Sequence, residues 1–213
     1  MTPKLVIFDC DGVLVDTEPV TDRILSDELQ QRGLDVAASD VHKLFAGGTM
    51  QGVMDTAIQM GADLPGDWLD HVYDRVFAAL RAGVPVIPGV IDLLDLLEAR
   101  GIAVAVASNG PMAKMEISLG PSGLWDRLHG RIYSREQHEA KPKPGMLLHA
   151  MRIVGADPAQ TVMIDDMPAG WLAAQAAKVR ALAYVADGGL ARAKGEVTGF
   201  TDMAQVPGLI GLD

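Results

Sequence analysis

Short apolar runs alternate with amphipathic stretches along most of this chain, and the alternation predicts its secondary structure. Five runs have the length and the buried character of strands in a parallel sheet. They lie at 5–8, 102–107, 131–133, 161–164 and 181–185. Between them, apolar residues recur at helical spacing, as in Val90, Leu93, Leu94 and Leu97. We therefore expect an α/β fold with a parallel sheet.

The segment 16–83 interrupts this alternation because its pattern is helical throughout. Val20, Ile24, Leu25 and Leu29 form one amphipathic face, and a second face begins at Trp68. Helices without a neighbouring strand cannot extend the sheet. We therefore predict a helical cap domain at 16–83 and a core domain made of 1–15 and 84–213. The tail after Gly188 carries little pattern, and we expect it to lie only on the surface.

Polar residues stand where the predicted strands end. Residues i and i+2 of a strand face the same side, so Asp9 and Asp11 should face one spot as the chain turns at Gly12. Other polar groups follow the later strands: Ser108, Asn109, Lys141, Asp165 and Asp166. In open α/β sheets, ligands bind outside the carboxyl ends of the strands. The pattern therefore predicts a single site at that edge.

Each of these groups also has a purely structural interpretation. Asp-x-Asp-Gly and Ser-Asn-Gly are common turn sequences. Asp165 and Asp166 could cap a helix that opens at Pro168. Lys141 could be a solvated charge, and Lys143 competes with it for the role of the functional lysine. Only the occurrence of all four groups together indicates a functional site.

The stretch from Asp9 to Glu18, DCDGVLVDTE, resembles the first signature of the haloacid dehalogenase-like hydrolases, in the branch that carries a helical cap. The other three polar groups match the remaining signatures in order and type. The resemblance implies a Rossmann-like, three-layer core with an inserted α-helical cap. It also implies that Asp9 is a nucleophile that forms an aspartyl phosphate, and that Asp11 is a general acid/base.

The chemistry of phosphate ester cleavage explains why these residue types are needed. A carboxylate that attacks a phosphate dianion is repelled unless the charge is neutralised, and Mg²⁺ prefers oxygen ligands. Asp9 with one or both of Asp165 and Asp166 would suit this ion, and the family pattern adds the backbone carbonyl of Asp11. Lys141 would supply fixed positive charge. Ser108 and Asn109 would bind the phosphate oxygens.

Composition narrows the classes of partner. The chain has 213 residues and a formal net charge of −10, which disfavours nucleic acids and anionic membranes as partners. Its single cysteine, Cys10, permits no internal disulfide. No apolar run is long enough to span a membrane, so we expect a cytoplasmic protein. A monomer or a weak homo-oligomer is the expected state, with a small phosphorylated metabolite as substrate.

Four activities are considered as interpretations. We favour a Mg²⁺-dependent phosphatase, and the stretch from Ser108 to Ser118 resembles bacterial 6-phosphogluconate phosphatases, with phosphoglycolate as a competing substrate. Lys114 or the Gly47–Gly48 turn could recognise a carboxylate of the substrate. A β-phosphoglucomutase is the alternative. A phospho-receiver module is disfavoured by the length of the chain and by the helical insertion, and a dehalogenase is disfavoured by the presence of Asp11.

Two residues depart from the family pattern. Gly145 stands where relatives usually carry Asp, and Lys178 stands where a glycine commonly ends a helix. Neither touches the inferred chemistry. We expect any consequence to be confined to the loop near Lys141 and to the exit of that helix.

Overall fold

The computed structural model describes residues 2–45, 50–186 and 197–212. The chain divides into two compact units. One unit consists of Met1–Asp16 and Pro85–Asp213, and the other consists of Thr17–Val84.

A six-stranded parallel sheet forms the centre of the first unit, in the order β3-β2-β1-β4-β5-β6. The strands are β1 (Leu5–Phe8), β2 (Ala103–Ser108), β3 (Ile132–Ser134), β4 (Thr161–Asp165), β5 (Arg180–Tyr184) and β6 (Thr198–Phe200). The predicted parallel α/β core is therefore confirmed. The five predicted strands are present, with ends displaced by no more than one residue.

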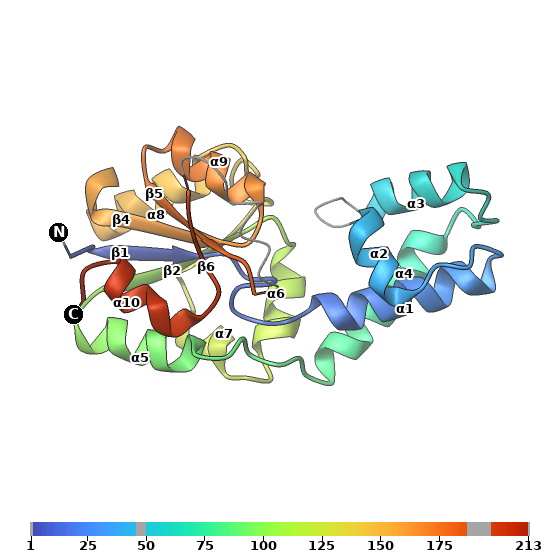
Figure 1. The fold of residues 1–213 in the computed structure, drawn as a ribbon, viewed down its shortest axis with the longest axis horizontal. Helices are drawn as coiled ribbons and strands as arrows, with labels where there is room; N and C mark the ends of the chain where they lie inside the picture. The colour runs from blue at the N-terminus through green and yellow to red at the C-terminus, as the bar shows by residue number, and fades with distance from the viewer. Residues whose placement is uncertain (1, 46–49, 187–196, 213) are drawn as a thin grey trace. The chain divides into compact units, whose positions relative to one another are not determined.

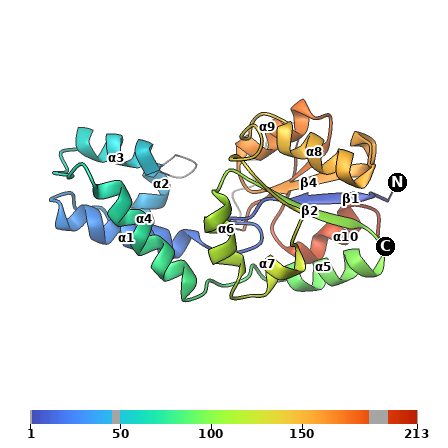
Figure 2. The same cartoon turned by 180° about the vertical axis from the view of Figure 1, so that it is seen from behind.

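Helices cover both faces of this sheet and make a three-layer unit (Figure 1). The helices α8 (Gly145–Val154) and α9 (Pro168–Ala176) pack on one face. The helices α5 (Val90–Ala99) and α10 (Val206–Leu209) lie on the opposite face, as the view from behind also shows (Figure 2). Two further helices, α6 (Met112–Leu119) and α7 (Leu124–Arg127), connect β2 to β3.

Alternating side chains of the central strands divide the core between these two layers. Leu5 and Ile7 of β1 are fully buried in one cluster with Met146 and Ala150 of α8 and with Ala173 of α9. Residues one position along a strand point to the other face. A strand between two helical layers therefore needs apolar residues at every position, which is why β1 reads as the unbroken run LVIF.

The C-terminal segment is part of the core, so the prediction of a surface tail is wrong. The strand β6 pairs in parallel with β5. Phe200 is 3% exposed, and its ring centroid lies 5.4 Å from that of Tyr184. A three-residue strand, Thr-Gly-Phe, is too short to show a period, and only its pairing with a distant segment makes it a strand.

The second unit is helical: α1 (Glu18–Gln31), α2 (Ala38–Phe45), α3 (Met50–Gln59) and α4 (Trp68–Arg81). The predicted faces of α1 and α4 are buried, including Leu29 and Trp68. Glu28 of α1 is also buried, and it pairs with Arg75 and His71 of α4. The predicted turn at Gly47–Gly48 lies outside the described residues.

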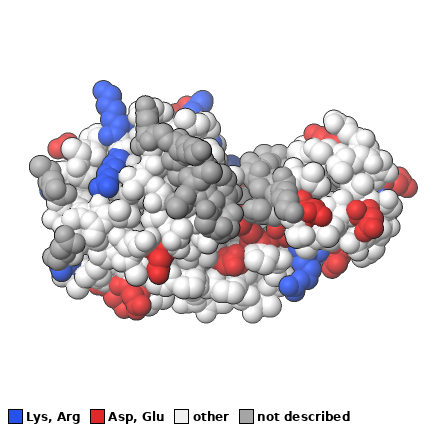
Figure 3. Space-filling model, in the orientation of Figure 1, with Lys and Arg blue, Asp and Glu red and all other residues white. Residues whose placement is uncertain are grey.

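The Lys and Arg side chains are scattered over the face of the molecule that is drawn in Figure 3. None of the helices in the described ranges is both long enough and apolar enough to cross a bilayer.

The two departures from the family pattern differ in their local structural consequences. Lys178 follows α9 with a φ of 59°, a left-handed conformation that costs a residue with a side chain roughly 1 kcal/mol relative to glycine. Gly145 begins α8 beside Glu139. A Cβ at Gly145 would lie 3.2 Å from the backbone nitrogen of Glu139, so this close approach favours glycine there.

The substitution Phe200→Ala tests whether the C-terminal strand supports the core. Removing this buried ring should lower the free energy of unfolding by about 3 kcal/mol, measured by urea denaturation. Thr198→Ala, on an exposed residue of the same strand, is the matched control and should change it by less than about 0.5 kcal/mol. Equal effects of the two substitutions would contradict the assignment of Phe200 to the core.

Candidate active site

The register of the sheet brings the predicted acidic groups to one edge. Phe8 of β1 is level with Val106 of β2 on one side and with Ile164 of β4 on the other. Asp9 therefore follows β1 at the level where β2 and β4 end. Ser108 is the last residue of β2 and Asp165 is the last residue of β4. Three residues that are distant in sequence meet because parallel strands end together.

Lys141 lies at the centre of this group. Its Nζ atom lies 2.8 Å from Asp9 Oδ1 and 2.6 Å from Asp165 Oδ2. All three residues are buried, and Lys141 is 6% exposed. Its rival Lys143 is exposed and pairs with Glu139 on the surface. The structure therefore places the first of the two candidate lysines, and not the second, among the carboxylates.

Burial and neighbouring charge shift the pKa values within this cluster. Burial raises the pKa of Asp9 to about 7, because the positive charge of Lys141 only partly offsets burial and the nearby charge of Asp165. Burial lowers the pKa of Lys141, but the charges of Asp165 and Asp9 outweigh it, so the net shift is upward. Lys141 therefore stays protonated, while Asp9 is partly protonated near neutral pH.

Asn109 fixes the backbone of Lys141. Its Nδ2 donates to the Lys141 carbonyl at 2.9 Å, and its Oδ1 accepts from the Lys141 N–H at 2.8 Å. This two-way bond ties the loop after β2 to the loop that carries the lysine. The side chain of Asn109 is thus engaged with protein, and its predicted contact with phosphate stays a prediction.

Ser108 is held by its own loop. Its buried Oγ accepts a hydrogen bond from the N–H of Gly110 at 3.0 Å. Ser134 of β3 donates to the carbonyl of Gly110 at 2.8 Å, which fixes the other side of the same turn. A hydroxyl that accepts this bond still has its own O–H with which to donate.

Three carboxylates could hold a metal ion. Asp9, Asp165 and Asp166 each offer an oxygen, and these oxygens lie within 4.8 Å of one another. Oδ1 of Asp9 is buried and faces the Lys141 ammonium at 2.8 Å. Three carboxylates beside one lysine form an all-oxygen set with excess negative charge, which fits a hard cation such as Mg²⁺.

Both side-chain oxygens of Asp165 are already engaged. Oδ1 accepts from the N–H of Met167 at 2.9 Å, and Oδ2 faces Lys141. The indole of Trp171 donates to the carbonyl of Asp165 at 2.7 Å. These contacts orient Asp165 toward the lysine, which leaves Asp9 and Asp166 as the better placed metal ligands.

Two glycines leave the space that these carboxylates fill. A Cβ at Gly170 would lie 1.8 Å from Oδ2 of Asp165. A Cβ at Gly12, which has a φ of 74°, would lie 2.6 Å from Oδ2 of Asp166. Gly170 and Trp171 were not among the predicted site residues. A glycine in the first turn of an otherwise Ala-rich helix was the available signal for Gly170.

Asp11 pairs with Lys114 of α6, whose Nζ atom lies 2.7 Å from Asp11 Oδ2. The sequence had suggested Lys114 only as a reader of substrate. Burial lowers the pKa of Lys114, but the charge of Asp11 and its hydrogen bond outweigh this and raise it. Cys10, between the two aspartates, has a pKa raised by burial and by both neighbouring charges, so its thiol is unreactive.

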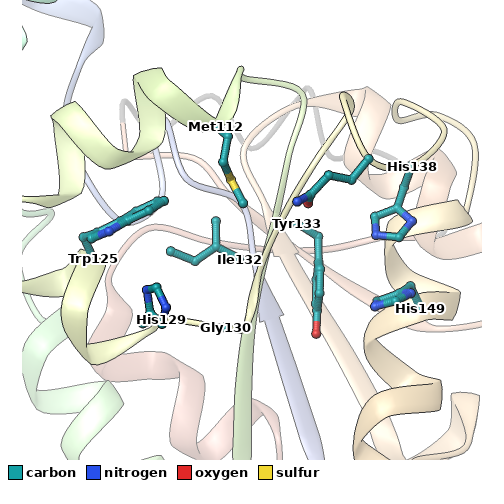
Figure 4. Close-up of a pocket in the computed structure, with 9 residues that line it drawn as sticks. Met112, Trp125, His129, Gly130, Ile132, Tyr133, His138 and His149 are labelled. Carbon is teal, nitrogen blue, oxygen red and sulfur yellow. The ribbon is translucent and has the colours of Figure 1, made fainter.

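A separate cavity of about 400 Å³ lies beside β3 in the same unit (Figure 4). It is lined by Trp125, Tyr133 and three histidines, and by none of the predicted site residues. His138 and His149 stack with ring centroids 4.3 Å apart. Arg152 lies 3.0 Å from Nδ1 of His149 and can only donate to it, which disfavours a metal there. The acidic cluster is therefore the stronger candidate site.

Comparison with known proteins agrees with this geometry. The family model for haloacid dehalogenase-like hydrolases matches residues 3–178. The chain belongs to this family. The predicted family is confirmed, and residues from all four of its signatures either contact Lys141 or provide it.

The relatives extend over most of the chain. It is 28% identical over 210 residues to the 6-phosphogluconate phosphatase of Escherichia coli K12, covering 97% of this chain and 94% of the relative. It is 28% identical over 195 residues to hexitol phosphatase B of the same organism, covering 85% and 84%. These relatives confirm the prediction of a phosphatase enzyme.

A solved structure shares the fold closely. It is a haloacid dehalogenase family hydrolase from Deinococcus radiodurans, crystallised with bound phosphate and sodium. It is 28% identical, with a TM-score of 0.85 over 99% of this chain and 97% of that one.

The substitution Gly170→Ala should disrupt the position of Asp165 in the acidic cluster. Its methyl group would displace the Asp165 carboxylate from Lys141, so we expect Mg²⁺ affinity to fall at least about tenfold, measured by calorimetry. The melting temperature should also fall. Gly66→Ala, at an open position, is the matched control and should leave both unchanged. Wild-type Mg²⁺ affinity in Gly170→Ala would refute the spatial argument.

The raised pKa of Asp9 predicts that metal binding releases a proton. Below pH 7 the metal-free protein holds Asp9 mostly protonated, and a cation binds the ionised form. Apparent Mg²⁺ affinity should therefore rise with pH up to about 7 and level off above it. Calorimetric titrations at pH 6 in two buffers of different ionisation enthalpy should report close to one proton released, and at pH 9 almost none. Equal proton release at both pH values would contradict this assignment.

Proposed function

We propose that the chain is a Mg²⁺-dependent phosphatase that hydrolyses a small phosphorylated metabolite through an aspartyl phosphate on Asp9. The observation that carries the proposal is the buried contact of Lys141 with Asp9 and Asp165. It holds a carboxylate beside a fixed positive charge, as attack on a phosphate monoester requires.

The residues divide the reaction into two steps. An oxygen of Asp9 attacks phosphorus, the bond from phosphorus to the leaving oxygen breaks, and Asp11 gives that oxygen its proton. Asp11 then takes a proton from water while the water oxygen attacks phosphorus, and the bond to Asp9 breaks. Free Asp9 and inorganic phosphate result, and Asp11 is again protonated.

The remaining groups stabilise charge during both steps. Lys141 faces the negative charge that develops on the phosphoryl oxygens, and the hydroxyl of Ser108 donates to one of them. Asp9 and Asp166, with the backbone carbonyl of Asp11, would hold Mg²⁺, while Asp165 orients the lysine. When bound, this ion supplies the positive charge that allows an anionic nucleophile to approach an anionic phosphate.

For the substrate we propose a sugar or sugar-acid phosphate. The support is the length of the match to a 6-phosphogluconate phosphatase and to a hexitol phosphatase. Phosphoglycolate is the competing acid substrate. The bound phosphate in the related Deinococcus structure supports phosphate as the recognised group. We further propose that the enzyme works in the cytoplasm, without a nucleic-acid or membrane partner, as a monomer or a weak homo-oligomer.

The test is phosphate release in the presence of Mg²⁺ from a panel of 6-phosphogluconate, phosphoglycolate, hexitol phosphates and β-glucose 1-phosphate. Wild type should release phosphate from at least one sugar-derived substrate. Asp9→Asn should lower kcat at least about 10³-fold, because the nucleophile is lost. Asp92→Asn, on the exposed side of α5, is the matched control and should behave as wild type.

The same panel distinguishes the alternative activity. Conversion of β-glucose 1-phosphate to glucose 6-phosphate, without phosphate release from any substrate, would identify a mutase and overturn the proposed hydrolysis. Release that persists in Asp9→Asn would overturn the assignment of the nucleophile.

A further inference from the structure

The active site contains a second lysine that the four family signatures do not include. Lys114 lies in the first turn of α6, and its ammonium is 2.7 Å from Asp11 Oδ2. The two side chains are only 21% and 24% exposed. An ion pair shielded to this degree holds its geometry better than a pair at the open surface. Lys114 therefore restricts where the Asp11 carboxylate can stand.

The loop before α6 leaves room for this pair. A Cβ at Gly110 would lie 3.6 Å from Asp11 Oδ2, 3.9 Å from Lys114 Cδ and 3.3 Å from Ser108 Oγ. Gly110 is thus surrounded by the three side chains that the site needs close together. Its N–H and its carbonyl are both hydrogen-bonded, to Ser108 and to Ser134. The base of α6, and Lys114 with it, is therefore anchored to the phosphate-binding loop.

The two lysines of the site contact different carboxylates. Lys141 contacts Asp9 and Asp165, and Lys114 contacts Asp11. Asp11 needs a defined position more than it needs fixed charge, because it must reach the leaving oxygen in one step and the attacking water in the next. A charged partner that is fixed on a helix can hold the carboxylate in that position.

We propose that Lys114 is a positioning residue, which holds the Asp11 carboxylate where it exchanges protons with the leaving oxygen and with water. The inference rests on the proposed function of Asp11. It replaces the expectation that Lys114 reads a carboxylate of the substrate. The two roles predict different kinetics. Loss of a residue that recognises the substrate mainly raises KM, whereas loss of a residue that positions Asp11 mainly lowers kcat.

The experiment uses p-nitrophenyl phosphate, whose leaving group departs without needing a proton. In Lys114→Met the first step should therefore survive, while the second step slows because water loses its base. Rapid mixing should show a burst of about one nitrophenolate per enzyme, followed by a kcat reduced about 10²-fold with KM within twofold of wild type. Lys114→Arg should recover much of the loss, because it restores the partner of Asp11.

Two controls distinguish an effect on the position of Asp11 from an effect on the folding of the protein. Lys143→Met removes an exposed lysine that pairs with Glu139, and it should show neither the burst nor the loss. Melting temperatures of all variants are compared, and Lys114→Gln provides a second neutral variant of lower hydrophobicity. Both neutral variants should show the burst.

Several outcomes would overturn the inference. If the neutral variants keep the wild-type kcat and show no burst, Lys114 has no role in the reaction. A raised KM confined to substrates with a carboxylate, with kcat unchanged, would make it a reader of substrate. Wild-type enzyme that releases no phosphate from any substrate would instead overturn the proposed function, and with it the inference that rests on it.

Discussion

The buried ammonium of Lys141 is the contact on which the rest of the site depends. A charge that is removed from water is stable only when it is paired and held. Here one lysine contacts two carboxylates, at 2.8 and 2.6 Å, and Asn109 fixes its backbone from the neighbouring loop. Asp9, Asp165 and Asp166 carry up to three formal negative charges against one positive charge. The excess suits a divalent cation. Burial first, and the charge of Asp165 in addition, raise the pKa of Asp9 to about 7 against the opposing charge of Lys141.

Glycine is as important to this cluster as the charged residues. The carboxylates of Asp165 and Asp166 occupy space that a side chain at Gly170 or Gly12 would fill. Gly110 has the same relation to Asp11 and Lys114. Close packing of charged groups against the backbone allows each carboxylate one orientation. The site is thereby organised before substrate arrives, which lowers the cost of reaching the transition state.

The core unit also shows why the size of a cavity is a poor guide to function. The cavity beside β3 is roomy, but it is lined by aromatic rings and by imidazoles, one of which already accepts from an arginine. Burial and the neighbouring His138 and Arg152 lower the pKa of His149, so this imidazole is neutral at physiological pH. The acidic cluster, in contrast, combines a nucleophile, fixed positive charge and metal ligands at the end of a parallel sheet.

Local sequence determined most of the fold of the core. An unbroken apolar run must be buried on both faces, so LVIF and the later runs were recognisable as strands, and the polar residues after them marked the functional edge. The sequence also favoured Lys141 over Lys143, from the Lys-Pro-x-Pro pattern of the family, and the structure places Lys141 among the carboxylates. The strand predictions succeeded because burial acts on residues that are neighbours along the chain.

Only the tertiary structure decided the contacts between distant segments. The residues of β6 show no alternation of apolar and polar side chains, and they form a strand because they pair with the edge of β5. The pairing of Lys114 with Asp11 and the bond from Asn109 to Lys141 join residues from segments that are far apart in the sequence. The spacing of apolar residues carries no signal for such contacts. They depend on the strand register, which brings these segments to one edge of the sheet.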